Sequence, residues 1–425
     1  MPNFLLELSH RKAPQPGIYS VCSAHPWVLE ASMRRHLSHN GPLLIEATCN
    51  QVNQFGGYTG MKPADFRELV HSIAARAGFP TDRIILGGDH LGPFPWQNLP
   101  PEHAMANAYE MVRLYVQAGY GKIHLDASMP CADDPHPLPD AVIAERAAKL
   151  CSVAEAAKGE DEPVYVIGTE VPTPGGAAEE VGLSVTPPEN AEQALRVHRE
   201  AFSSHSLDRA WERVIALVVQ PGVEFGNETV EDYSSAKAAS LSALLNRHLG
   251  LVFEAHSTDY QRPQAFLDLV RDGFAILKVG PALTYAMRQA LFALAAIETE
   301  CVPAQQRSHL AERVEQTMLA HPQYWQRHYA GSPEQQHHLR IHSYSDRIRY
   351  YWAYTEVKRA VESLLRNLEN STIPETLLSD YLPAQYMKVR SGTLENKPLS
   401  LILDAIGNAL DPYLAACEAL DCSPR

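Results

Sequence analysis

Membrane and secretion signals are absent from this chain. No apolar run approaches the roughly 20 residues that a membrane-spanning helix needs, and the first residues lack the apolar segment of a secretory signal. The seven cysteines are scattered, and no CxxC pair occurs. This spacing excludes a zinc ribbon and a disulfide framework. We therefore expect a soluble cytoplasmic protein whose thiols stay reduced.

Basic residues are also fewer than acidic residues. The chain has 36 lysines and arginines against 50 acidic residues, which gives a net charge of −14, and no Lys/Arg cluster is evident. Nucleic acids and anionic membranes attract such clusters, so neither is an expected partner. A small anionic substrate fits this charge only if its pocket is locally positive.

Three common motifs are missing as well. The chain has no GxxxxGK[ST], no GxGxxG after a predicted strand and no GxSxG. A P-loop kinase, a dinucleotide-dependent enzyme and an α/β-hydrolase are therefore disfavoured. We expect no nucleotide cofactor.

What the chain does contain is a series of short β-like runs, rich in Val, Ile and Leu, with room for a helix between successive runs. Nearly every run ends in polar or ionisable side chains. Eight strand–helix units are what a (β/α)8 barrel requires, and such barrels place their chemistry at the carboxyl ends of the strands. The sequence predicts an α/β fold, a (β/α)8 TIM barrel with a C-terminal helical extension, with strands over 17–24, 43–48, 84–90, 122–128, 165–171, 214–220, 251–257 and 274–280.

Helical spacing follows the strands and continues after they stop. Helices are expected over 26–40, 63–77, 102–118, 140–157, 189–203, 234–247, 261–272 and 282–299, and then over 308–319, 345–368 and 398–420. The chain has 425 residues, more than the ~250 of a bare barrel. We expect a barrel over 1–300 and a C-terminal helical subdomain over 301–425, packed on the barrel or on a partner. The loop at 172–188 is either a lid or a surface excursion.

Histidines stand at the ends of two predicted strands. Asp89-His90 ends the third strand, and His256 ends the seventh. An imidazole beside a carboxylate at a strand end can bind a metal while the acid handles protons, although satisfied structural histidines show the same pattern. Because two independent strands carry one, we predict His90 and His256 as ligands of a divalent metal (Zn, Mn or Ni), with Asp89 catalytic.

Three carboxylates, Glu46, Asp126 and Glu170, end the second, fourth and fifth strands. A buried carboxylate needs a cation, hydrogen bonds or a metal, unless it points outward to a helix terminus. A divalent ion meets this need better than the few basic residues in view. We predict Glu170 as a third metal ligand, and Asp126 and Glu46 as catalytic residues.

The loops after the last strands suggest a phosphate site. Glycine-containing loops at this position, backed by helix N-termini, commonly hold phosphate. The amides after strand two suit sugar hydroxyls or a structural loop, and Lys278 could instead be a Schiff-base nucleophile. The predicted substrate and phosphate contacts are Asn50, Gln54, Gln220, Ser257, Thr258, Lys278 and Gly280. The segment 345–352 could send an arginine to the barrel mouth or only pack helices.

Several longer stretches carry a family resemblance: Ile45-Glu-Ala-Thr-Cys-Asn-Gln-Val-Asn-Gln-Phe-Gly-Gly-Tyr-Thr-Gly60, Leu86-Gly-Gly-Asp-His-Leu-Gly-Pro93, Lys122-Ile-His-Leu-Asp-Ala-Ser-Met129, Tyr165-Val-Ile-Gly-Thr-Glu-Val-Pro172, Val218-Val-Gln-Pro-Gly-Val-Glu-Phe225, Glu254-Ala-His-Ser-Thr-Asp-Tyr-Gln261 and Ile276-Leu-Lys-Val-Gly-Pro-Ala-Leu283. Together they resemble the GatZ/KbaZ-type subunit of tagatose-1,6-bisphosphate aldolase, at times labelled a tagatose-6-phosphate kinase. The resemblance runs from about Ser20 to the C-terminus. The kinase label fits poorly with the missing nucleotide motifs.

This resemblance implies a barrel that partners a separate zinc-dependent class II aldolase chain in tagatose 6-phosphate and galactitol-type catabolism. It implies a non-catalytic accessory subunit that supports the activity and stability of the catalytic chain, because a partner that binds only the native state stabilises it. Assembly with further copies of this chain is left open.

The barrel also resembles the catalytic class II aldolases. Asp89-His90 matches the pair in which their His binds zinc and their Asp handles protons, and His256 resembles a later zinc ligand. Gln220 stands where those enzymes have another zinc histidine, and an amide is a poor substitute. This leaves an alternative function, a metal-dependent 4-epimerase interconverting tagatose 6-phosphate and fructose 6-phosphate. A catalytically dead ligand sensor is a third hypothesis.

Overall fold

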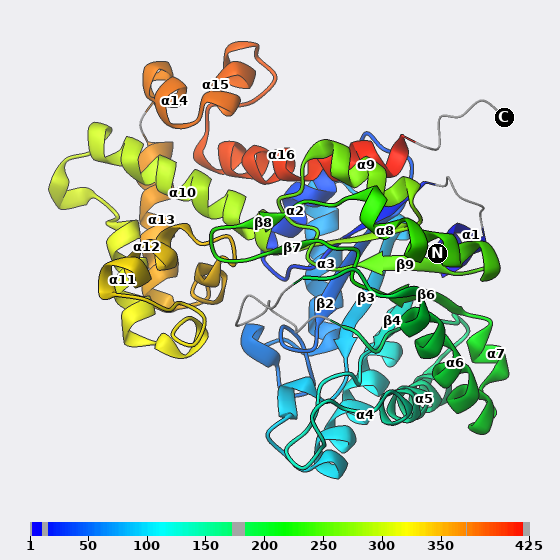
Figure 1. The fold of residues 1–425 in the computed structure, drawn as a ribbon. Helices are drawn as coiled ribbons and strands as arrows, with labels where there is room; N and C mark the ends of the chain where they lie inside the picture. The colour runs from blue at the N-terminus through cyan, green and yellow to red at the C-terminus, as the bar shows by residue number, and fades with distance from the viewer. Residues whose placement is uncertain (1, 11–15, 172–182, 371, 420–425) are drawn as a thin grey trace.

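The computed structural model describes residues 2–10, 16–171, 183–370 and 372–419. All eight predicted runs form strands, and these close into one parallel barrel (Figure 1). The fold prediction is confirmed. In barrel order the strands are β1 (Ile18–Val21), β2 (Leu43–Thr48), β3 (Ile84–Leu91), β4 (Lys122–Leu125), β5 (Val164–Ile167), β6 (Val214–Val218), β9 (Val252–Ala255) and β10 (Ile276–Val279).

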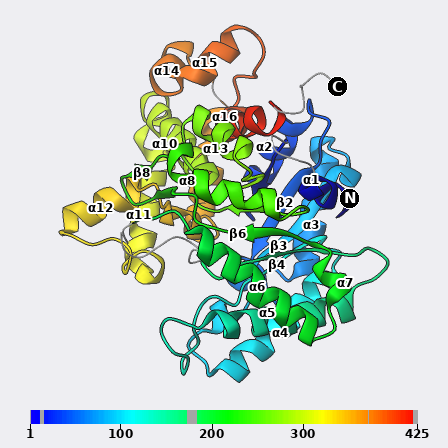
Figure 2. The ribbon, with the colours of Figure 1, turned by 45° about the vertical axis from the view of Figure 1, so that its right-hand side comes forward.

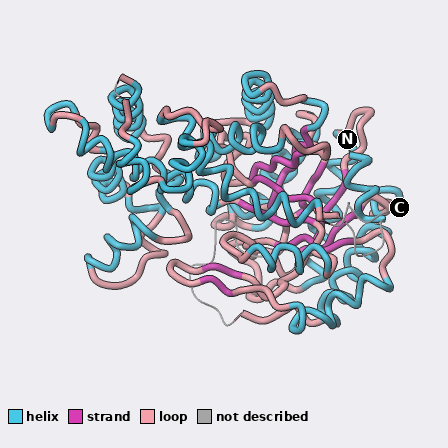
Figure 3. Tube along the Cα trace, turned by 90° about the horizontal axis from the view of Figure 1, so that it is seen from above, coloured by secondary structure: helices cyan, strands magenta, loops and turns pink. Residues whose placement is uncertain are grey.

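Helices surround this barrel, as a parallel sheet buried on both faces requires. Most of them begin with proline at the first position, where the missing N–H costs nothing. Figure 3 shows the strands in the interior and the helices around them. The helices that follow the strands are α2 (Pro26–His36), α3 (Pro63–Ala77), α4 (Pro101–Gln117), α5 (Asp140–Ala157), α6 (Pro188–Ser204), α8 (Ser235–Ser242), α9 (Pro263–Arg271) and α10 (Pro281–Cys301).

Three additions to the barrel were not predicted. The helix α1 (Pro2–His10) places Leu5 and Leu8 in the apolar cluster that fills the barrel interior, together with side chains such as Ile18 and Val252. A short helix, α7 (Asp208–Trp211), precedes β6, and a small hairpin of β7 (Glu224–Phe225) and β8 (Val230–Glu231) follows it. Loops at the carboxyl side of β6 therefore carry extra structure.

The C-terminal part is helical, as predicted, but one helix boundary was wrong. The expected helix over 345–368 is a 3-10 turn, η7 (Arg347–Tyr350), followed by α13 (Thr355–Glu369). Asp346 stands before η7 with a left-handed φ of 45°, which an α-helix does not accept. The other helices are α11 (Leu310–Ala320), α12 (Pro333–His342), α14 (Glu375–Tyr381), α15 (Pro383–Arg390) and α16 (Pro398–Glu418).

The last helix, α16, returns to the barrel and packs against α2, α9 and α10 (Figures 1 and 2). Its Tyr413 is buried, with its ring centroid 4.1 Å from that of Phe266. The Tyr413 hydroxyl donates to the carbonyl oxygen of Thr258 at 3.0 Å. The C-terminal residues thus hold the loop that follows β9. Among the described residues, no helix is long and apolar enough to cross a membrane.

Candidate functional site

Three imidazoles and one carboxylate meet at the carboxyl ends of the strands. Asp89 and His90 come from the end of β3, His124 from β4, and His256 from the residue after β9. One ligand atom of each lies within 4.8 Å of those of the other three, and all four side chains are buried. The ring centroids of His90 and His256 are 4.8 Å apart. We call these four residues the histidine cluster.

Glycines around Asp89-His90 make room for this arrangement. A Cβ on Gly87 would lie 2.3 Å from Glu46 Oε1, and a Cβ on Gly92 would lie 1.5 Å from the carbonyl oxygen of Asp126. The pairing of β3 with β4 shifts register between Gly88 and Leu91, and His90 has a φ of 51°. The Gly-Gly-Asp-His-Leu-Gly sequence therefore bends the end of β3 so that both Asp89 and His90 face the interior.

Carboxylates outside the histidine cluster orient two of its rings. Asp126 Oδ2 lies 2.7 Å from His90 Nδ1, and Asp126 Oδ1 accepts from the Ser128 hydroxyl at 2.6 Å. Glu254 Oε1 lies 3.0 Å from His256 Nε2. A carboxylate that accepts from one ring nitrogen leaves the other nitrogen as the available lone pair. Asp126 thus positions His90.

The third ring, His124, has a different environment. Its Nδ1 lies 3.0 Å from Asp89 Oδ1. Its Nε2 is buried and has no hydrogen-bond partner within the part of the chain that the structure describes. A buried polar atom without a partner is costly unless a ligand satisfies it. The buried Nε2 of His124 is the feature of the site that most favours a bound metal ion.

Below the histidine cluster lies a network of buried charges. The Lys122 ammonium is 2.6 Å from Glu46 Oε1 and 2.7 Å from Glu254 Oε2, and all three side chains are fully buried. Lys278 contacts Glu46 directly and lies 3.0 Å from Asp89 Oδ1. Ions taken out of water need such mutual pairing. The network therefore pairs the carboxylates of Glu46, Asp89 and Glu254 with two ammonium groups at the base of the site.

The pKa values agree with this charge pattern. Burial would raise the pKa of Asp89. The electrostatic interaction with His90 and the hydrogen bond with His124 outweigh burial and hold that pKa well below its usual value. Burial also opposes ionisation of Asp126, and the hydrogen bond with His90 again keeps its pKa low. Burial lowers the pKa of Lys278 to about 8. Both aspartates are therefore ionised at neutral pH.

A cavity opens above the histidine cluster. It is lined by Asp89, His90 and His256, by Asn50, Gln51 and Tyr58 from the segment after β2, and by Phe225, Ser257, Asp259, Lys278, Gly280, Arg349 and Tyr350. Amide, hydroxyl and ammonium groups can bind sugar hydroxyls and oxyanions. We call this space the barrel-mouth cavity.

The structure brings together most of the residues predicted for metal binding and catalysis, with one exception. Asp89, His90 and His256 lie in the histidine cluster, Asp126 beside it, and Glu46 in the charge network. Glu170 lies elsewhere: it is exposed, and its carboxylate accepts from Thr186 Oγ1 and Asn190 Nδ2, both at 2.7 Å. Because β5 ends at Ile167, Glu170 is past the strand end and turns outward.

The predicted substrate contacts divide into two groups. Asn50, Ser257, Lys278 and Gly280 line the barrel-mouth cavity. The other three bind the protein itself: Gln54 donates to the Asn107 carbonyl at 3.0 Å, Gln220 accepts from the Gly222 N–H at 2.8 Å, and the Thr258 hydroxyl donates to the Lys278 carbonyl at 2.6 Å. These three side chains hold loops in place.

Sequence reasoning missed His124, Lys122 and Glu254. A signal existed for His124: in Lys122-Ile-His-Leu-Asp126 the alternate residues share one face of a strand, so the face that carries Asp126 also carries His124 and Lys122. Glu254 and His256 alternate in the same way. Of the two alternatives for the segment 345–352, the structure shows an arginine at the barrel mouth, because Arg349 lines that cavity.

The closed barrel places the molecule among the (β/α)8 barrel proteins, with imidazoles and carboxylates meeting at the carboxyl ends of its strands. Residues 5–418 match the model of one family, the D-tagatose-1,6-bisphosphate aldolase subunit GatZ/KbaZ-like family. The chain belongs to this family, as the sequence resemblance predicted, and the family links it to tagatose-bisphosphate aldolase as a subunit.

One solved structure supports the family assignment. A probable tagatose 6 phosphate kinase from Sinorhizobium meliloti 1021 is 51% identical, with a TM-score of 0.88; the match covers 94% of this chain and 100% of that one. Two weaker likenesses, below 15% identity, carry no argument about function. The fructuronate-tagaturonate epimerase from Cohnella laeviribosi is 12% identical (TM-score 0.47, covering 96% of this chain and 84% of that chain). The fructose-bisphosphate aldolase from Campylobacter jejuni is 14% identical (TM-score 0.42, covering 90% of this chain and 92% of that chain).

Proposed function

We propose that this chain is a metal-dependent 4-epimerase that interconverts tagatose 6-phosphate and fructose 6-phosphate. The observation that carries the proposal is the histidine cluster, above all the buried Nε2 of His124. A scaffold that served only to bind another chain would have no need for three imidazoles at the mouth of its barrel. Burying such polar groups without a ligand is destabilising.

The donor set fits a divalent metal. His90, His124 and His256 would hold the ion, and imidazole with carboxylate suits Zn²⁺, Mn²⁺ or Ni²⁺. When bound, such an ion supplies positive charge that polarises ketone and hydroxyl oxygens. The carboxylates of Asp126 and Glu254 keep two of these rings in the required orientation. No nucleotide is needed for this reaction.

Epimerisation at C4 requires a proton acceptor beside the sugar. Asp89 lines the barrel-mouth cavity beside the three imidazoles, and we assign its carboxylate to take the proton of the C4 hydroxyl. The C3–C4 bond then breaks to give an aldehyde and an enediolate, re-forms on the opposite face of the aldehyde, and the proton returns to the new hydroxyl. Asn50 and Ser257 line the same cavity and can bind sugar hydroxyls. Asp126 is the positioning residue of His90.

The test combines metal analysis with an activity assay on the purified chain. Wild-type protein should retain about one equivalent of a divalent metal after dialysis and convert tagatose 6-phosphate to fructose 6-phosphate. His124→Gln should lose both, while His103→Ala, which changes an exposed histidine on α4, should retain both. A wild-type chain that binds metal but shows no turnover, or a His124→Gln variant with full turnover, would contradict the proposal.

A second candidate function is the accessory role, and the family match supports it. In this role the chain binds the catalytic class II subunit of tagatose-bisphosphate aldolase and stabilises its native state. Purified alone, the chain would then cleave no tagatose 1,6-bisphosphate. Adding it should raise the thermal unfolding temperature of the catalytic subunit, and His124→Gln should do so as well as wild type. If His124→Gln failed to raise the unfolding temperature of the catalytic subunit, the accessory role would depend on the histidine cluster.

A further inference from the structure

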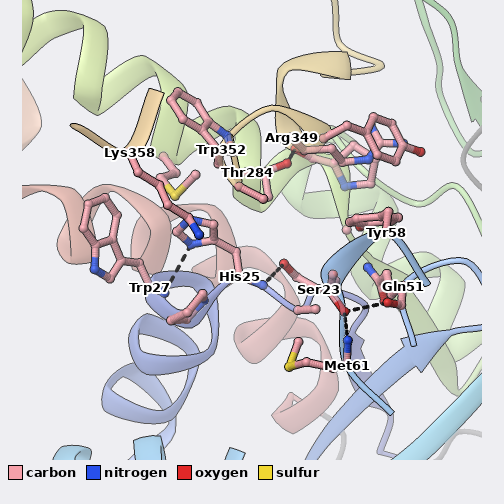
Figure 4. Close-up of a pocket in the computed structure, with 18 of the residues that line it drawn as sticks. Ser23, His25, Trp27, Gln51, Tyr58, Met61, Thr284, Arg349, Trp352 and Lys358 are labelled. Carbon is pink, nitrogen blue, oxygen red and sulfur yellow. Dashed lines mark hydrogen bonds between the residues drawn. The ribbon is translucent and has the colours of Figure 1, made fainter. Parts of the chain in front are cut away.

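A second cavity adjoins the barrel-mouth cavity, and Arg349 stands where they meet. This second space, of about 440 Å³, lies between the loop after β1, the start of α10 and the segment from η7 to α13. Figure 4 shows Arg349 and Tyr58 on one side of it, and Trp27, Trp352 and Lys358 on the other. Gln51, Tyr58, Arg349 and Tyr350 line both spaces. We call this space the aromatic cavity.

The fold holds Arg349 at this position. Asp346, with its left-handed φ of 45°, turns the chain into η7, and its Oδ2 accepts from the Thr284 hydroxyl on α10 at 2.5 Å. The Arg349 guanidinium donates to the Asp346 carbonyl and to the Tyr350 hydroxyl, both at 3.1 Å, and lies 4.6 Å from the centre of the Tyr350 ring. An arginine that is stacked and bonded in this way is pre-organised for binding an oxyanion.

Charged side chains of both signs line the barrel-mouth cavity beside Arg349. Among the described residues, Asp89 and Asp259 are the acidic side chains that line the barrel-mouth cavity, and each contacts groups of the protein. Asp89 faces Lys278 at 3.0 Å. Asp259 Oδ1 accepts from the backbone N–H groups of Gly280 at 3.0 Å and Ala282 at 2.8 Å. Lys278 and Arg349 are the lysine and arginine that line this cavity within the described part of the chain, in a protein whose overall charge is −14.

The hydrogen bonds of Asp259 also occupy the backbone N–H groups where the sequence predicted a phosphate. The N-terminus of α10, at Gly280 and Ala282, is already capped by the Asp259 carboxylate. The Thr258 hydroxyl is bonded to the Lys278 carbonyl, and it lies 3.2 Å from the Tyr413 hydroxyl. A phosphate would have to displace a buried carboxylate to use these donors.

We infer that Arg349 binds the anionic end of the substrate while the keto and hydroxyl groups lie at the histidine cluster. This inference rests on the proposed function, which identifies the anion as the phosphate group of a ketohexose phosphate. A sugar acid would present a carboxylate with the same chemistry. In this arrangement a residue of the C-terminal helical region determines specificity at the mouth of the barrel.

The test is calorimetric binding to the metal-loaded full chain with three probes: D-tagatose 6-phosphate, D-tagaturonate and uncharged D-tagatose. Arg349→Met should weaken binding of tagatose 6-phosphate by 10- to 100-fold and leave D-tagatose unchanged, because only the anion loses a charge-assisted contact. Arg349→Lys should recover part of the loss. Arg359→Met, which removes an exposed arginine on α13, is the matched control and should bind like wild type.

Folding is checked separately, because Arg349 also donates to backbone carbonyls. Both Arg349 variants are compared with wild type in thermal unfolding and metal content, and line broadening of inorganic phosphate in ³¹P NMR gives a second measure of anion binding. Phosphate broadening that persists in a folded Arg349→Met, or equal losses for tagatose and its phosphate, would overturn the inference. So would a wild-type chain that binds none of the anions.

The inference and the proposed function can fail independently. Arg349-dependent binding of tagatose 6-phosphate without any epimerisation would support the anion site and reject the epimerase. Tighter, Arg349-dependent binding of D-tagaturonate would support the residue's role and change the anion to a carboxylate. Epimerisation that survives Arg349→Met with an unchanged KM would reject the inference alone.

Discussion

The Lys122 ammonium offers the sharpest test of how the barrel interior is built. Lys122→Met keeps a long side chain of similar shape but removes the cation between Glu46 and Glu254, which it approaches to 2.6 Å and 2.7 Å. Neither carboxylate can reach water, since both side chains are fully buried. In this variant Lys278 is the remaining lysine of the network that pairs with both Glu46 and Glu254.

The magnitude follows from this geometry. Removing one partner of a buried ion pair costs about 3–5 kcal/mol of stability, because the other charge stays buried. Lys278 contacts Glu46 and lies 3.8 Å from Glu254, so it compensates part of the loss. We therefore expect the lower end, a destabilisation of about 3 kcal/mol. Replacing Glu254 by Gln in the same chain removes the excess negative charge and should restore more than half of this loss.

The assay is urea unfolding followed by circular dichroism at neutral pH, with the free energy of unfolding extrapolated to water. Lys149→Met is the matched control. It breaks an ion pair with Glu145 at 3.1 Å in which both side chains are nearly half exposed. Exposed pairs contribute little, so this variant should stay within about 0.5 kcal/mol of wild type.

A loss below about 1 kcal/mol in Lys122→Met would refute the view that the buried network depends on this cation. The same holds if Lys122→Met with Glu254→Gln is no more stable than the single variant. Either result would mean that solvent or relaxation screens the interior far more than the packing indicates.

Three further predictions concern the site and the core. Asp126→Asn should weaken zinc or manganese binding by about 10- to 100-fold, because His90 loses the carboxylate that orients it at 2.7 Å; an unchanged affinity in a folded variant would remove this role. Gly87→Ala should destabilise the chain by about 1–3 kcal/mol in urea, since its Cβ would lie 2.3 Å from Glu46 Oε1, whereas Gly41→Ala meets nothing within 4 Å and should be neutral. Burial lowers the pKa of His198 from 6.5 to about 4, so the stability it contributes is present above pH 6.5 and is lost as the pH falls towards 4. Wild type should lose about 1–2 kcal/mol more than His198→Leu between pH 7 and pH 5, and equal losses would contradict this assignment.

Much of the architecture could be predicted from local patterns. Runs of Val, Ile and Leu that alternate with helical spacing predict strand–helix units, and eight such units are what a (β/α)8 barrel requires. The convergence of Asp89, His90 and His256 followed from the same rule, because parallel strands bring their carboxyl ends to one face. The strands, the helices and the residues at the strand ends could be predicted because they depend on local sequence patterns.

Other features were decided by the tertiary structure alone. Glu170 looked like a strand-end ligand, but β5 ends three residues earlier and the side chain turns outward. The phosphate donors expected at Gly280 are capped by Asp259, and Arg349 reaches the barrel mouth from the C-terminal helices. Sequence spacing determines which residues can share a strand or helix face. The neighbours, charges and free space of each side chain are set only when distant segments close around one another.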